Sequence, residues 1–109
     1  MVGNNIKIYQ ADVRCGYAFM NHAYAVRKDA DLKTLKDYSL VYEGTYNSVN
    51  TDIEDLLEEI FTDGNIGMLR QLMDEQCDKA RSLSVSDVIE VDGVRYYVEP
   101  FGYEAIGRA

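Results

Sequence analysis

The chain has 109 residues and a net charge of −8, with 47% hydrophobic and 28% charged residues. This length suits one globular domain spanning 1–109, and this composition excludes an intrinsically disordered chain. The sequence has no apolar run long enough for a membrane span or a signal peptide, so we expect a cytoplasmic protein.

Charge is unevenly distributed along the chain. Residues 1–36 carry six Lys/Arg and three Asp, a balance of +3, whereas residues 37–109 carry five Lys/Arg and sixteen Asp/Glu, a balance of −11. Binding to a nucleic-acid backbone needs a basic face, which only the N-terminal third could supply. The chain's Cys15, Cys77 and His22 are too few for a structural zinc site, so we expect no metal and no cofactor.

The first half of the chain predicts two strands and a short helix. Alternation of apolar and polar residues predicts a strand at 6–9 and another at 38–43, which Gly44 closes. Helical spacing within 15–28 predicts a short helix, and 34–37 reads as a connection.

A longer helix follows these elements. Thr51 and Glu54 have the spacing of a capping box, in which each side chain bonds a free backbone N–H of the first turn. Asp63-Gly64 predicts the end of this helix, and a second helix is expected at 67–79. The first of these helices has an apolar stripe at Ile53, Leu56, Leu57, Ile60 and Phe61.

The segment from Val88 to Glu99 predicts a β-hairpin. Asp92-Gly93 is the dipeptide that a two-residue type I′ turn favours, because both positions need a positive φ. That turn places Glu90 opposite Arg95, and it also pairs Val91 with Val94, Ile89 with Tyr96 and Val88 with Tyr97. With a short last strand at 103–106, the elements predict an α+β fold, either a mainly antiparallel sheet or a partly open barrel, with two to three helices.

Alternating serines precede the hairpin, at Ser82, Ser84 and Ser86. A nucleophilic serine needs a base and an orienting acid, and Ser86 with His22 and an Asp is the set that the chain can supply. No Gly-x-Ser-x-Gly elbow accompanies it. We therefore expect the serines and Asp87 to form turns by bonding the backbone, and we expect no enzymatic activity.

The acidic face of the first long helix is the candidate interaction surface, consisting of Asp52, Asp55, Glu58 and Glu59. Most such faces are simply solvated. The alternative is that the carboxylates imitate the phosphates of a duplex and occupy a basic groove on a nucleic-acid enzyme. The nine tyrosines leave another alternative, which is stacking on exposed bases, beside their ordinary use in a half-buried sheet.

The serine run and hairpin also carry a family resemblance. The stretch RSLSVSDVIEVDGVRYYVEPFGYEAI, preceded by YSLVYEG and LLEEIF, resembles the YodL-like domain family over about residues 38–106, and IYQ at Ile8–Gln10 resembles an earlier part of it. The lead Ser-Val-x-Asp-Val-Ile into a glycine turn is also similar, as a fold only, to one edge of PUA-like barrels. The family-motif positions, which we expect to be structural, are Arg81, Ser82, Leu83, Ser84, Ser86, Asp87, Val88, Gly102 and Tyr103.

The YodL-like resemblance implies a biological setting and no catalytic residues. It implies a small bacterial domain of conjugative-element and phage proteins, some of them thought to counter host defences. We therefore expect a non-enzymatic accessory module of a mobile genetic element, acting by protein–protein contact on a host-defence or nucleic-acid-handling protein. The alternative is a nucleic-acid-binding domain of PUA-like shape that uses the tyrosines and the basic N-terminal third.

Overall fold

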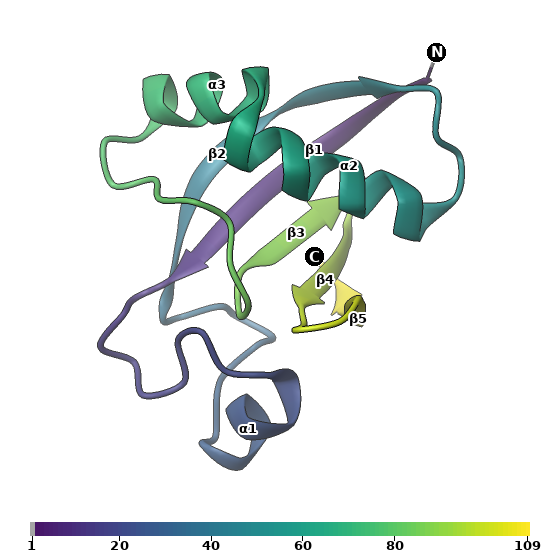
Figure 1. Cartoon of the computed structure of the whole chain (residues 1–109). Coiled ribbons are helices and arrows are strands. Elements are labelled where there is room, and N and C mark those ends of the chain that lie inside the picture. Colours follow the sequence, from purple (N-terminus) through teal and green to yellow (C-terminus); the bar gives the residue numbers. More distant parts are fainter. Residues whose placement is uncertain (1) are drawn as a thin grey trace.

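The computed structural model describes residues 2–109, and within them the chain forms three helices and five strands in an α+β fold (Figure 1). The prediction of the fold class is confirmed. The elements are β1 (Val2–Ala11), α1 (His22–Arg27), β2 (Tyr38–Ser48), α2 (Ile53–Ile66), α3 (Met68–Gln76), β3 (Val88–Val91), β4 (Val94–Val98) and β5 (Tyr103–Arg108).

The strands form one antiparallel sheet in the order β2-β1-β3-β4-β5. Within residues 2–109 the sheet does not close on itself, so β2 and β5 are its two edges. Of the two predicted architectures, the open antiparallel sheet is therefore the one that forms. The first strand lies inside the sheet, where it pairs with β2 on one side and β3 on the other.

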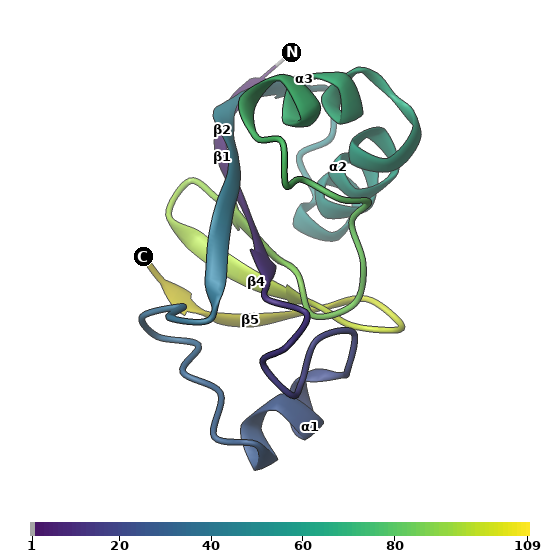
Figure 2. The same cartoon turned by 90° about the vertical axis from the view of Figure 1, so that its left-hand side faces the viewer.

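Helices cover the two faces of the sheet separately. Figure 2 shows α2 and α3 together on one side of β1 and β2, and α1 apart from them, close to β5. The core under α2 and α3 includes Ile6, Ile8, Leu57, Ile60, Met73, Leu83, Ile89 and Val98. A smaller core under α1 and its flanking loops consists of Ala11, Tyr17, Ala25, Leu35, Val88 and Tyr97.

The C-terminal hairpin has the predicted register. Asp92 and Gly93 have φ values of 48° and 87°, as a type I′ turn requires. Glu90 lies opposite Arg95, and the Arg95 Nε donates to the Glu90 carboxylate at 3.1 Å. The Asp92 carboxylate also accepts from the backbone N–H of Asn5 at 2.9 Å, which fastens the turn to β1.

The predicted end of β2 at Gly44 was wrong, since the strand continues to Ser48 with Gly44 paired to Ile6. A Cβ at position 44 would lie 2.5 Å from the hydroxyl oxygen of Tyr42, on the same strand. Gly44 is therefore required by the Tyr42 ring that covers it, and not by a turn.

The predicted cap and end of the long helix were also wrong. Its N-cap is Asp52 in place of Thr51, because the Asp52 carboxylate accepts from the backbone N–H groups of Glu54 (3.0 Å) and Asp55 (3.2 Å). The helix passes Gly64 and ends at Ile66. A Cβ at Gly64 would lie 2.6 Å from Leu83 Cδ1, so this glycine allows the serine run to pack closely on the helix.

The two shorter helices are displaced or trimmed at their ends. Only His22–Arg27 of the segment expected to be helical at 15–28 forms α1, whose N-cap Asn21 accepts from the backbone N–H of Tyr24 at 2.8 Å. Similarly, α3 ends at Gln76, with Cys77 as its C-cap. Residues 12–20 form loops over the second face of the sheet instead of helix.

Candidate functional site

The serine run connects α3 to β3, and its polar groups hold neighbouring segments in place. Ser86 is fully buried and has a positive φ of 83°. Its hydroxyl oxygen accepts from the backbone N–H of Phe19 (2.8 Å), and its carbonyl oxygen accepts from the Tyr38 hydroxyl (2.6 Å). The Ser84 hydroxyl donates to the Ser82 carbonyl at 3.3 Å. Ser86 thus joins the loops that precede β2 to the C-terminal half of the sheet.

Asp87 is a completely buried acid at the start of the hairpin. Its carboxylate accepts from the backbone N–H of Ser84 (2.9 Å) and the Gln10 amide (3.1 Å), and it lies 3.5 Å from the Arg81 guanidinium. Burial raises the pKa of Asp87 from 3.8 to about 6, against the Ser84 N–H and Arg81, which favour the charged form. This carboxylate organises a turn and is enclosed by its donors.

Two side-chain amides hold the backbone on either side of Ser82. The Gln10 amide accepts from the Arg81 N–H (3.0 Å) and donates to the Arg81 carbonyl (2.9 Å). The Asn65 amide accepts from the Leu83 N–H (2.6 Å) and donates to the Leu83 carbonyl (3.2 Å). Because Gln10 lies in β1 and Asn65 in α2, the serine run is fastened to the sheet and to the helical layer at once.

His22 has other partners than the serine hydroxyls. Its ring packs edge-on against Tyr97, with 5.3 Å between ring centroids, and its backbone N–H donates to the Glu99 carboxylate at 2.6 Å. Among residues 2–109, no hydrogen bond joins His22 to Ser86, whose hydroxyl oxygen accepts from the Phe19 N–H instead. The geometry therefore does not assemble the Ser–His–Asp set that the sequence allowed.

Gly102 and Tyr103 lie at the turn from β4 to β5. Gly102 has a positive φ of 81°, and its carbonyl accepts from the Glu99 N–H at 3.0 Å. The Tyr103 hydroxyl donates to the Glu58 carboxylate at 2.9 Å, which connects β5 to α2. This hydrogen bond adds to burial in raising the pKa of Tyr103. The motif residue Tyr103 thus positions one of the carboxylates of the candidate interaction surface.

The four carboxylates of that surface differ in their roles. Asp52 is used as the helix N-cap, and Asp55 and Glu58 are exposed. The expectation of a simply solvated face is wrong for Glu59, whose carboxylate accepts from the Ser48 hydroxyl (2.6 Å) and the Asn50 amide (2.6 Å). These donors belong to the end of β2 and the loop after it, so Glu59 ties this loop to the middle of α2.

Asp55, Glu58 and Glu59 line an open groove of about 620 Å³ together with Asp63, which we call the acidic groove. The Tyr46 hydroxyl lies 2.8 Å from the Asp63 carboxylate and 3.1 Å from the Glu59 carboxylate, between the two groups. None of the ion pairs formed within residues 2–109 involves these four acids. The groove therefore holds ordered negative charge without an internal cation.

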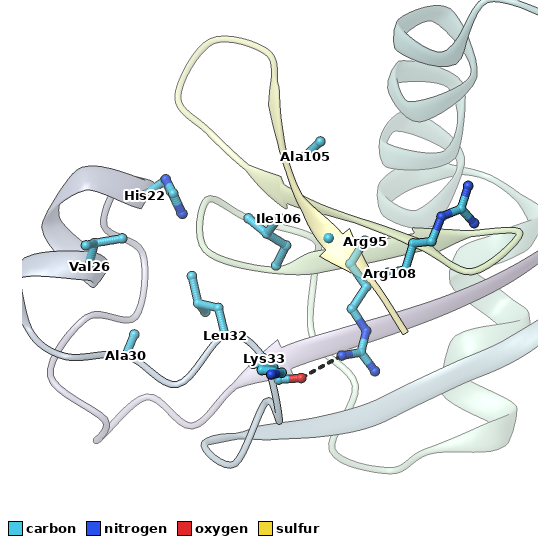
Figure 3. Close-up of a pocket in the computed structure, with 10 residues that line it drawn as sticks. His22, Val26, Ala30, Leu32, Lys33, Arg95, Ala105, Ile106 and Arg108 are labelled. Atoms are coloured by element: carbon cyan, nitrogen blue, oxygen red, sulfur yellow. Dashed lines mark hydrogen bonds between the residues drawn. The ribbon is translucent and has the colours of Figure 1, made fainter.

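A second hollow, of about 530 Å³, lies between α1 with its following loop and β5 (Figure 3). Its basic lining residues are His22, Lys33, Arg95 and Arg108. We call it the basic cleft. Sequence reasoning missed it because its two walls are far apart in the chain, and the only signal was the positive balance of residues 1–36.

Comparison with known proteins places the chain in a family. A family model described as the YodL-like domain matches residues 5–108. The chain belongs to the YodL-like domain family. The match extends the resemblance over 38–106 to β1 from Asn5 onward, including IYQ at Ile8–Gln10, and to the loops before β2. No curated protein and no solved structure matches the chain.

Two further findings describe the YodL-like domain. Across residues 2–109, no cluster of three or more His, Cys, Asp or Glu side chains is placed to hold a metal ion. In the same part of the chain, no helix has the length and apolar character needed to cross a membrane.

In this YodL-like domain most family-motif residues build a junction between α3 and β3, and Tyr103 alone among them contacts the acidic groove, through Glu58. Arg81, Ser84, Ser86 and Asp87 fix the chain between α3 and β3. Sequence reasoning did not find the two hydrogen bonds by which Gln10 holds the backbone of Arg81, because an isolated glutamine in a strand gives no signal of its own. It also missed Asp63 as a member of the acidic groove, although Asp63 follows Glu59 at the helical spacing of four residues.

Proposed function

We propose that this YodL-like domain is a non-enzymatic interaction module of a mobile genetic element, which acts in the cytoplasm by contact with a partner protein. The proposed partner is a nucleic-acid-handling protein, because such a protein presents a basic surface to its substrate. The link to mobile elements rests on the family resemblance, and the chemistry of the contact rests on the acidic groove.

The acidic groove carries the proposal. Three of its four carboxylates, those of Glu58, Glu59 and Asp63, are held by hydroxyl groups of Tyr103, Ser48 and Tyr46, so their positions are set before a partner arrives. Fixed charges cost less to order on binding and repel partners of the wrong sign. Ordered carboxylates without an internal cation are therefore suited to a basic protein surface.

Exposed apolar side chains in this region favour a protein as the partner over small dissolved cations. Ile66 lines the groove and is 84% exposed. Phe101 is outside the groove lining and is 97% exposed, two residues before Tyr103, whose hydroxyl reaches Glu58. Protein interfaces gain most of their affinity from a few such apolar and aromatic anchors within a polar surround.

A photo-crosslinking amino acid at Thr62, an exposed position in the groove lining, tests the proposal in cells. We expect one predominant protein adduct, identified by mass spectrometry, and we expect Asp55→Asn with Glu58→Gln to abolish it. Both side chains are exposed and neither substitution touches the N-cap, so the fold should be retained.

The matched control is Glu75→Gln with Asp78→Asn, which removes the same amount of charge from exposed positions outside the groove. The control should leave the adduct intact, whereas loss in both double variants would mean that only net charge matters. An adduct that survives in Asp55→Asn/Glu58→Gln would contradict the proposal.

Fluorescence anisotropy with labelled duplex DNA and RNA examines the nucleic-acid-binding alternative. We expect no binding at physiological salt, because the groove would repel phosphates. Binding that weakens steeply with added salt would favour the alternative.

A further inference from the structure

The basic cleft combines an apolar floor with basic residues around it. Val26 and Leu32 come from the α1 side, and Ile106 faces them from β5 (Figure 3). The volume of about 530 Å³ falls in the range of roughly 300–1,000 Å³ that is typical of sites that bind small molecules or short segments. The cleft is therefore large enough for several side chains of an incoming ligand.

The edge strand β5 forms one wall of the cleft. Residues 105–108, four in succession, line it. Arg95 of β4 lines it as well, so the hollow takes in the outer part of the sheet next to the edge strand. Among the described strands, β5 pairs with β4 alone, so the outer row of its backbone N–H and C=O groups has no strand partner.

The pairing of β5 makes this edge accessible. The register between β4 and β5 shifts where Arg95 pairs with Gly107 and Tyr96 pairs with Ala105, which leaves Ile106 as the extra residue of a bulge. Gly107 has a φ of 124°, and a Cβ placed there would meet no atom within 4 Å. The backbone at Gly107 is therefore open to a close approach by another chain.

The charge of the cleft is positive in a protein whose net charge is −8. No acid is among the residues that line it. Arg95 is held by Glu90 and by the Lys33 carbonyl, to which it donates at 3.0 Å. Lys33 and Arg108 are exposed, and within residues 2–109 neither forms an ion pair. These two cations are free to meet an incoming carboxylate.

We propose that the basic cleft is a second interaction site, which takes an extended acidic peptide segment of a partner protein as an added strand along β5. The backbone of the peptide bonds the free edge, and alternate side chains reach the apolar floor and the two free cations. This site shares no residue with the acidic groove, so its proposal stands apart from the function proposed above.

A displayed library of random linear dodecapeptides, selected against the immobilised full chain, tests this proposal. We expect enrichment of sequences in which Asp or Glu alternates with apolar residues. Lys33→Glu with Arg108→Glu should weaken the binding of the most enriched peptide by at least about tenfold, the effect of losing two charge contacts. Asp55→Asn with Glu58→Gln should leave the affinity within about twofold, because these residues lie in the other site.

Two further measurements locate the bound peptide and its backbone contacts. Amide chemical shifts should change mainly in Ala105–Arg108 and His22–Lys33 when the peptide is added. N-methylation of every second peptide residue should abolish binding in one of the two registers and be tolerated in the other, because only one row of peptide N–H groups faces β5. Tolerance in both registers would refute strand addition.

The remaining outcomes also decide the question. Failure to enrich any peptide, or binding that survives the double charge reversal, would overturn the proposal. If the β5 amides shift with protein concentration in the absence of peptide, the edge pairs with a second copy and the proposal is wrong. If labelled RNA binds the chain and loses affinity in Lys33→Glu/Arg108→Glu while no peptide is enriched, the cleft is a nucleic-acid site.

Discussion

Replacing Asp87 by Asn should change the way the stability of the domain depends on pH. Asp87 has no exposed surface, and burial raises its pKa from 3.8 to about 6. Between these two values the folded chain holds a proton on Asp87 that the unfolded chain has released. The contribution of Asp87 to the free energy of unfolding is therefore fully present below about pH 4 and is lost as the pH rises through about 6.

The magnitude follows from the difference between the folded and unfolded pKa. A rise from 3.8 to about 6 corresponds to about 3 kcal/mol, since each pH unit is worth about 1.4 kcal/mol. Asn cannot titrate, so the free energy of unfolding of the wild type minus that of Asp87→Asn should fall by about this amount between about pH 4 and about pH 7 and stay level above it.

Urea unfolding of both proteins, followed by circular dichroism at a series of pH values, gives this difference curve. Taking the difference cancels the pH dependence that the other carboxylates contribute in both proteins. One of these is Asp12, whose pKa is lowered to about 2 by hydrogen bonds from Arg14. A difference that rises with pH would refute the reasoning. It would mean that the donors from Arg81, Gln10 and Ser84 outweigh burial and favour the charged form.

Two other substitutions test the hydrogen bonds between Asn65 and Leu83 and the conformation of the hairpin turn. Asn65→Ala should lower the free energy of unfolding by about 2–3 kcal/mol, because it leaves the buried backbone N–H and C=O of Leu83 without their partners. Asn65→Asp keeps the acceptor for the Leu83 N–H but places a carboxylate oxygen against the Leu83 carbonyl, so it should be destabilising as well, and wild-type stability in Asn65→Asp would count against the donated hydrogen bond. Gly93→Ala should lower the free energy of unfolding by about 1–2 kcal/mol in the same urea assay, because φ is 87° at this position. An added Cβ would meet no atom within 4 Å, so the cost is purely conformational. Unchanged stability would show that the turn is not type I′ in solution.

Local chemistry explains why the hairpin was predictable. Asp92-Gly93 requires a particular turn, and that turn alone sets Glu90 against Arg95. The family motif was recognisable for the same reason, since its serines and Asp87 act within a few residues of one another. The class of fold and the acidic residues on α2 also followed from patterns along the chain.

Contacts between distant segments explain what the sequence did not reveal. Gly44 and Gly64 resembled stops, yet each is a glycine because Tyr42 or Leu83 packs against it. The acidic side chains were predictable, whereas their arrangement depends on hydroxyl groups of β2 and β5. The basic cleft exists only because the sheet brings β5 beside the loop after α1.

The position of β1 inside the sheet has a kinetic consequence. Its two neighbours are β2 and β3, and Ile6 pairs with Val91 near the other end of the chain. Pairing over so long a separation folds slowly, because the entropy of closing the loop is lost before the contact is gained. During synthesis, the edge of β1 that carries Ile6 and Ile8 stays unpaired until β3 has left the ribosome. The nascent domain is therefore most prone to aggregation just before its C-terminal hairpin forms.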